Sequence, residues 1–303
     1  MQLQGHLNHE PGWRVKTIKG TIIAALVVMG SLVVSFVEAP RSALYTAFRE
    51  INKHTVSFQT RGWESIEGTN FEIRYQPQDA EIAELVLKTA EMSVEPVNTK
   101  LGFTPQGKTL VLVYPTRAAL GKSFGWAADQ SAMGVYWAGV IRVLSPMAWV
   151  ESAAAGEVEK EFRSSGPMVH EYTHLVVDYI TRGNYTRWLT EGIAQYVERE
   201  ITGFMLSELL YRPGEEWFPL CELDEEFDTA FGQSKAYRQS LAMMDYLVEE
   251  YGEDTIVGIL NRLGEGTSIK KAWKEELGVS LEEFEQHFNY WTHFQTINEV
   301  RTL

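Results

Sequence analysis

Cysteine is nearly absent from this chain, and there is no surplus of basic residues. Cys221 is the single cysteine among 303 residues, so no disulfide can form within the chain. We expect Cys221 to pack as a small apolar residue and not to act as a nucleophile. Because 27 basic residues face 41 acidic ones, the formal net charge is −14. A surface of that sign repels nucleic acid, so we expect no nucleic-acid partner.

Long apolar runs are also scarce, and the clearest one lies near the amino terminus. Residues 21–37 carry no charge and are just long enough to cross a bilayer. Three basic residues precede the run, so the positive-inside rule places residues 1–20 in the cytoplasm and the remainder outside the cell. A cleaved signal peptide is the alternative, although Pro40 directly after the cleavage-like residues disfavours it. A buried core helix is a third interpretation. We expect residues 21–37 to anchor a single-pass protein of the cell membrane.

Repeats and low-complexity stretches are absent, which excludes solenoid and disordered classes of protein. With 45% hydrophobic residues, the chain can build a sizeable core. The first 37 residues hold three basic groups and one acidic group, so 24 basic and 40 acidic residues remain, a formal charge of −16. We expect a juxtamembrane segment with one short helix over residues 38–65, followed by a folded domain over residues 66–303.

One short run carries recognisable chemistry. Residues 170–174 read His-Glu-Tyr-Thr-His, and residues four apart share one face of a helix. Two imidazoles at that spacing can bind one Zn²⁺, and the glutamate beside the first can act on a zinc-bound water. Glu191 follows in the run Trp-Leu-Thr-Glu-Gly and offers a third protein ligand. Two histidines and one glutamate leave a coordination position open, which is typical of catalytic zinc.

The surrounding sequence favours this interpretation over two chance histidines on a surface helix. Gly166-Pro167 is a turn signal, and apolar residues then recur at three- and four-residue steps over residues 168–180. A second helical pattern runs from residue 188 to about residue 200 and includes Glu191. Two antiparallel helices joined by a short loop can direct all three groups to one point. The other five histidines show no ligand spacing.

These residues resemble the gluzincin metallopeptidases, and most of all the small peptidase MA-like proteins of bacteria. The resemblance extends over about residues 65–295, and the zinc motif is its most specific part. It implies that His170, His174 and Glu191 bind one Zn²⁺ per chain and that Glu171 is the general base. No Gly-x-Met-Glu-Asn motif precedes the zinc helix, which argues against the aminopeptidase activity of larger relatives.

Strand patterns followed by helical patterns predict an α+β fold. An N-terminal mixed sheet with helices would precede a mostly helical C-terminal half, and the resemblance places a zinc cleft between them. Residues 211–231 read as an irregular loop near that cleft, with an acidic cluster that is either solvated or binds a cation. The expected strands lie near 69–75, 109–114 and 134–144, and the other expected helices lie at 79–100, 234–251, 253–263, 268–277 and 280–298.

Further polar residues are candidates for the reaction. Tyr237 is the candidate donor to the oxyanion, with plain packing as the alternative, and Arg238 and His287 are substitutes for the same role. Asp178 lies one turn after His174, where it can accept a hydrogen bond from a ligand imidazole or remain solvated.

The segment 134–144 is the expected substrate edge. An exposed edge strand binds an extended peptide through main-chain hydrogen bonds. Gly134, Tyr136 and Trp137 are therefore candidate substrate-binding residues, with the two aromatic side chains lining a pocket. The alternative is an ordinary strand whose aromatic residues belong to the core.

The sequence thus predicts a membrane-anchored, extracytoplasmic zinc endopeptidase that acts on peptide or protein substrates. Two other functions remain open at this point. One is a zinc-binding interaction module without activity, and the other is an amidase that acts on cell-wall peptides.

Overall fold

A computed structural model describes residues 41–125, 132–151, 155–205, 215–227, 229 and 232–302. The expected cytoplasmic segment 1–20 and the expected anchor 21–37 lie outside these residues, as do residues 211–214, 228 and 230–231 of the predicted loop. Within the described part of the chain, no helix is both long enough and apolar enough to cross a bilayer. Arg41 begins the folded unit that holds all described residues.

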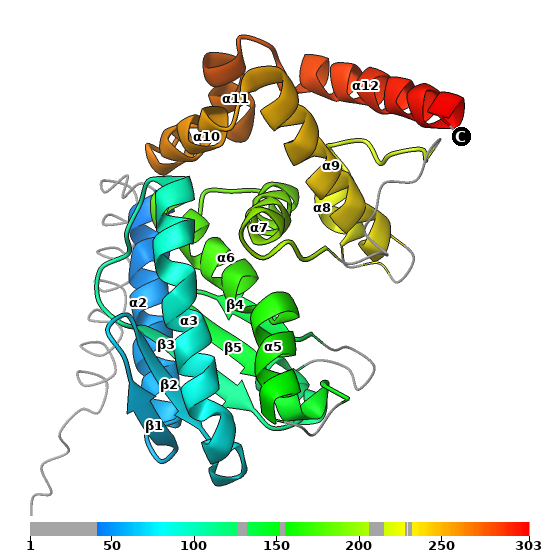
Figure 1. Cartoon of the computed structure of the whole chain (residues 1–303). Coiled ribbons are helices and arrows are strands. Elements are labelled where there is room, and N and C mark those ends of the chain that lie inside the picture. The colour runs from blue at the N-terminus through cyan, green and yellow to red at the C-terminus, as the bar shows by residue number, and fades with distance from the viewer. Residues whose placement is uncertain are drawn as a thin grey trace, which may run out of the picture. The chain divides into compact units, whose positions relative to one another are not determined.

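Five strands form one mixed sheet in the order β1-β2-β3-β5-β4 (Figure 1). The central strands β2, β3 and β5 are parallel, whereas β1 and β4 are antiparallel edge strands. Every residue of β3 and β5 is buried, as expected for parallel strands covered on both faces. The strands are β1 Glu64–Glu67, β2 Phe71–Tyr75, β3 Thr109–Tyr114, β4 Gly134–Trp137 and β5 Val140–Leu144.

The segment 134–144, expected to be one strand, is a hairpin instead. The chain reverses at Ala138 and Gly139, whose φ angles are 42° and 86°. Positive φ at both central residues is the backbone of a tight two-residue hairpin turn. Apolar residues continue on both sides of the turn, so the sequence pattern alone does not show the reversal. The hairpin makes β4 the edge strand of the sheet.

Two helices cover one face of the sheet, and two others lie on the opposite face. On the first face, α3 (Ala80–Leu101) and α6 (Met168–Thr181) pack against the sheet and each other. The helix α3 includes Pro96 and continues to Leu101. On the opposite face, the end of α2 (Arg41–Gln59) and α4 (Arg117–Phe124) enclose a smaller apolar cluster.

The expected juxtamembrane segment 38–65 is not separate from the domain. The helix α2 has 19 residues, and polar contacts with the domain add to the apolar packing of its last turn. Arg49 pairs with Asp178 of α6 at 3.1 Å, and Asn52 donates to the carbonyl of Ala138 at 2.9 Å. The expected boundary between residues 65 and 66 falls inside β1. The folded unit therefore begins at Arg41.

The C-terminal half is mostly helical, so the predicted α+β class is confirmed. The helix α7 (Arg187–Thr202) packs between α6 and α9 (Gln233–Tyr251), as Figure 1 shows. Trp188 of α7 lies edge-to-face on the buried Trp273, with ring centroids 5.5 Å apart. The remaining helices are α5 Ala155–Ser165, α8 Leu223–Glu226, α10 Asp254–Gly264, α11 Ile269–Leu277 and α12 Leu281–Thr302.

Candidate metal centre

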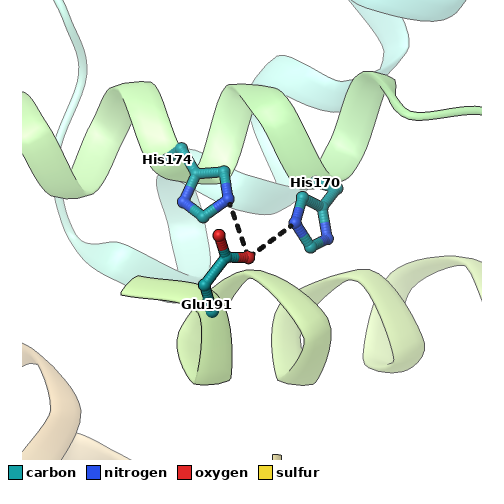
Figure 2. A group of neighbouring side chains, drawn as sticks. All are labelled: His170, His174 and Glu191. Atoms are coloured by element: carbon teal, nitrogen blue, oxygen red, sulfur yellow. Dashed lines mark ion pairs between the residues drawn. The ribbon is translucent and has the colours of Figure 1, made fainter. Parts of the chain in front are cut away.

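The helices α6 and α7 bring the three predicted zinc ligands together. His170 and His174 lie one turn apart on α6, and their ring centroids are 4.8 Å apart. Glu191 lies on α7, and both imidazoles point toward its carboxylate (Figure 2). One ligand atom from each residue lies within 4.8 Å of the others. Among the described residues, this is the one group of three or more such side chains close enough to hold a metal ion.

Hydrogen bonds fix how the two imidazoles face the carboxylate. The Nδ1 of His170 donates to Oε2 of Glu198 at 3.1 Å, and the Nδ1 of His174 lies 2.7 Å from Oγ1 of Thr190. Each Nε2 atom lies 3.4 Å from Oε2 of Glu191. Metal-binding histidines commonly use one ring nitrogen in this way and present the other to the ion.

The charge balance at this point also fits a cation. The Oε2 of Glu191 is buried and has no hydrogen-bond partner, which is costly for a carboxylate. Burial raises the pKa of Glu191, but the nearby His174 and His170 outweigh it and hold that pKa far below its usual range. Burial lowers the pKa of His170, but the neighbouring carboxylates of Glu191 and Glu198 raise it well above the ordinary value. A pair of imidazoles and one carboxylate is a zinc donor set.

Glu171 is held against the edge strand of the sheet. Its side chain is 6% exposed, and its Oε2 accepts a hydrogen bond from the backbone N–H of Tyr136 at 2.6 Å. Burial raises the pKa of Glu171, which makes its carboxylate a stronger base than an exposed glutamate. A Cβ at Gly134 would lie 2.7 Å from Cγ of Glu171 and 2.6 Å from Cβ of Pro167. Gly134 is therefore the residue that leaves room for this carboxylate.

Tyr237 is the candidate reaction residue that reaches the cluster. Its hydroxyl, on α9, donates to Oε1 of Glu191 at 3.4 Å. The charge of Glu191, followed by burial, raises the pKa of Tyr237, so the phenol stays protonated at neutral pH. Arg238 is instead buried and donates to Glu215 through its Nε at 3.0 Å. His287 is exposed on α12.

Asp178 lies in a different network from the one expected. Its carboxylate accepts from the hydroxyl of Tyr136 and pairs with Arg49 of α2. The imidazole partners are Glu198 and Thr190, which the sequence interpretation did not name. Glu198 lies seven residues after Glu191 on the same helix, so the shared helix face could have indicated it.

The two aromatic residues of β4 do not line one pocket. The hydroxyl of Tyr136 donates to Asp178 and accepts from the backbone N–H of Gly139 at 2.9 Å, which ties it to the protein interior. Trp137 is 55% exposed. The side chain of Tyr136 thus has a structural role, while its backbone contacts Glu171.

Two other expectations concern the segment before α9. Cys221 is exposed, so the prediction that it packs as a small apolar residue is wrong. In the acidic cluster, Asp224 accepts a hydrogen bond from the backbone N–H of Trp188 at 2.9 Å. A carboxylate at this position satisfies a free donor in the first turn of α7. Asp224 therefore supports the helix that carries Glu191.

Comparison with protein families agrees with the motif. Residues 157–294 match the family model of the Peptidase MA superfamily. A search for similar curated proteins returned no match. The matched segment includes α6, α7 and α9, and therefore all the side chains of the candidate centre. The match over residues 157–294 is consistent with a gluzincin-like peptidase MA family, the family that the zinc motif resembles.

Proposed function

We propose that this protein is a zinc metallopeptidase in which His170, His174 and Glu191 hold the metal. The convergence of one ligand atom from each of these three residues within 4.8 Å carries the proposal. Zinc held there supplies Lewis acidity toward a water molecule and a substrate carbonyl. Glu171 then takes the proton of the attacking water and gives it to the leaving amine. Tyr237, a neutral phenol beside the cluster, donates a hydrogen bond to the developing oxyanion.

The outer edge of β4 is the proposed binding site for the substrate backbone. The carbonyl of Met133 accepts from the N–H of Leu144 at 2.8 Å, so the backbone groups of alternate residues face β5. The backbone N–H and carbonyl groups of Gly134 and Tyr136 consequently face away from β5. The N–H of Tyr136 donates to Glu171. An extended peptide would therefore bond to the carbonyl of Tyr136 and to the N–H and carbonyl of Gly134. The cleft would lie between this edge and α7, and we propose endopeptidase action because the edge is open to extended chains.

We also propose that residues 21–37 anchor the protein in the membrane with the catalytic domain outside the cell. The support is the uncharged 17-residue run and the three basic residues that precede it. Alkaline carbonate extraction of membranes tests this point, because an anchored protein stays in the membrane pellet. Release into the supernatant would contradict the anchor.

The test of the proposed activity is the variant Glu171→Gln in the full-length chain. We expect loss of peptide hydrolysis while the zinc content stays at the parent level, because the amide cannot accept the proton. Glu157→Gln on the exposed side of α5 is the matched control and should retain activity. A zinc-loaded parent that cleaves neither protein nor wall-peptide substrates would contradict the enzymatic function and favour an interaction module. Cleavage of wall peptides alone would identify the amidase.

A further inference from the structure

The helix α2 has an apolar face directed away from the domain. Leu44, Phe48, Ile51 and Phe58 are 64%, 46%, 64% and 65% exposed. Their spacing of four, three and seven residues places them along one side of the helix. Single exposed apolar residues are ordinary, but a row of four along one helix marks an interaction surface. We call these four residues the outer face of α2.

Charge on α2 follows the opposite arrangement from that of a normal surface helix. Arg49 and Lys53 are directed inward, where Arg49 pairs with Asp178 and Lys53 donates to the hydroxyl of Tyr179 at 3.4 Å. Among the residues between 42 and 59 that are exposed as a whole, none is charged, and Glu50, whose side chain is 45% exposed, pairs with Lys53 at 3.1 Å. Besides the outer face, the exposed residues are Ala43, Ala47, His54, Thr55 and Gln59.

The position of α2 in the chain indicates what covers this face. Three residues separate the apolar run 21–37 from Arg41, the first residue of α2. Three residues span at most about 10 Å, so an anchored chain holds the start of α2 at the bilayer surface. An amphipathic helix at that surface buries its apolar face at the boundary between headgroups and acyl chains. None of the four side chains is charged, so their burial in lipid carries no desolvation cost of a charge. Arg61, which lies over the ring of Phe58 at 4.1 Å, places a cation at the end of this face, where it can reach the headgroups.

We propose that the outer face of α2 lies in the interfacial region of the lipid bilayer. This inference rests on the proposed membrane anchor and adds a second, independent contact with lipid. The inward face of α2 holds α6 through Arg49 and the β4–β5 turn through Asn52. Docking of α2 on lipid therefore holds the edge strand and the metal centre at a fixed height above the membrane.

The test uses the full-length chain in phosphatidylcholine vesicles with an environment-sensitive fluorophore on one cysteine. Cys221 is exposed and is replaced by serine first. Labels at Phe48→Cys and Ile51→Cys should show blue-shifted emission and strong quenching by nitroxide-labelled lipid. A label at Met92→Cys on α3 is the matched control, because Met92 is also an exposed apolar residue at 54%. That label should report water and remain unquenched.

A second variant keeps the test independent of the label chemistry. With the label at position 48, Leu44→Glu combined with Ile51→Glu should abolish lipid quenching while the zinc content is retained. If the protein resists carbonate extraction but the labels at positions 48 and 51 report water, the docking of α2 is overturned and the anchor remains intact. Shielded labels that lipid nitroxides do not quench, or cysteine cross-links between two copies, would also overturn it. Protein that fails to enter vesicles at all would instead refute the anchor.

Discussion

Replacement of Gly192 by alanine should loosen the contact between α7 and α9 beside Glu191. A Cβ at Gly192 would lie 2.5 Å from the backbone oxygen of Ser240 and 2.9 Å from Cγ of Met244. Ordinary contact begins near 3.4 Å, so the helices must separate by about 0.9 Å. A backbone oxygen cannot rotate away, so we take the upper range for overpacking, about 3 kcal/mol. The higher helix propensity of alanine offsets about 1 kcal/mol of this loss, so the net destabilisation is about 2 kcal/mol.

Urea unfolding followed by tryptophan fluorescence measures this loss, and the nine tryptophans of the chain give the signal. The matched control is Gly156→Ala in α5, where an added Cβ meets no atom within 4 Å. That control should be stabilised by up to about 1 kcal/mol, because alanine is the better helix residue. Gly192→Ala should also weaken zinc binding, because Glu191 is its neighbour in the chain. A Gly192→Ala protein as stable as the parent would refute the close packing of α7 on α9.

Three further predictions concern the centre and the fold. Glu198→Ala removes the acceptor that orients His170 and should lower zinc affinity by roughly 10- to 100-fold in a chelator competition assay. Gly134→Ala should displace the carboxylate of Glu171 and lower kcat, while the zinc content remains that of the parent. Burial raises the pKa of Asp79, so folding favours its protonated form and the folded protein loses stability as pH rises through that range. Asp79→Asn should therefore raise the urea midpoint at pH 7 and leave it unchanged near pH 3, where both side chains are neutral.

Each of these predictions has a result that would contradict it. Unchanged zinc affinity in Glu198→Ala would mean that its hydrogen bond does not orient His170. Full activity in Gly134→Ala would show that the base does not lie against β4. An equal effect of Asp79→Asn at both pH values would assign the change to packing and not to ionisation.

The local part of this structure could be predicted from the sequence, because short-range periodicity determines it. The four-residue spacing of His170 and His174 and the apolar steps around them identified α6 within one residue at its carboxyl end. The helices α9 to α11 also begin and end within one residue of the expected bounds. Glu191 could be assigned because its run has a recognisable pattern.

The long-range part could not be predicted in the same way. The partner of Asp178 is Arg49, 129 residues earlier, and no periodicity links the two. The hairpin at Ala138 was missed because apolar residues continue through it, and the edge position of β4 depends on that turn. A short helix within the segment 38–65 could be predicted, but its packing on the domain could not, because that packing depends on the distant pair of Arg49 and Asp178.

Zinc content is the measurement that tests the central claim most directly. The full-length protein, purified without added metal, is analysed by metal mass spectrometry beside Glu191→Ala and Glu200→Ala. Glu200 lies on the same helix but is exposed, so its variant is the matched control. We expect about one zinc per chain in the parent and the control, as in other sites with three protein ligands, and a sharp loss in Glu191→Ala. A folded parent that holds no zinc, even after incubation with the metal, would contradict the account.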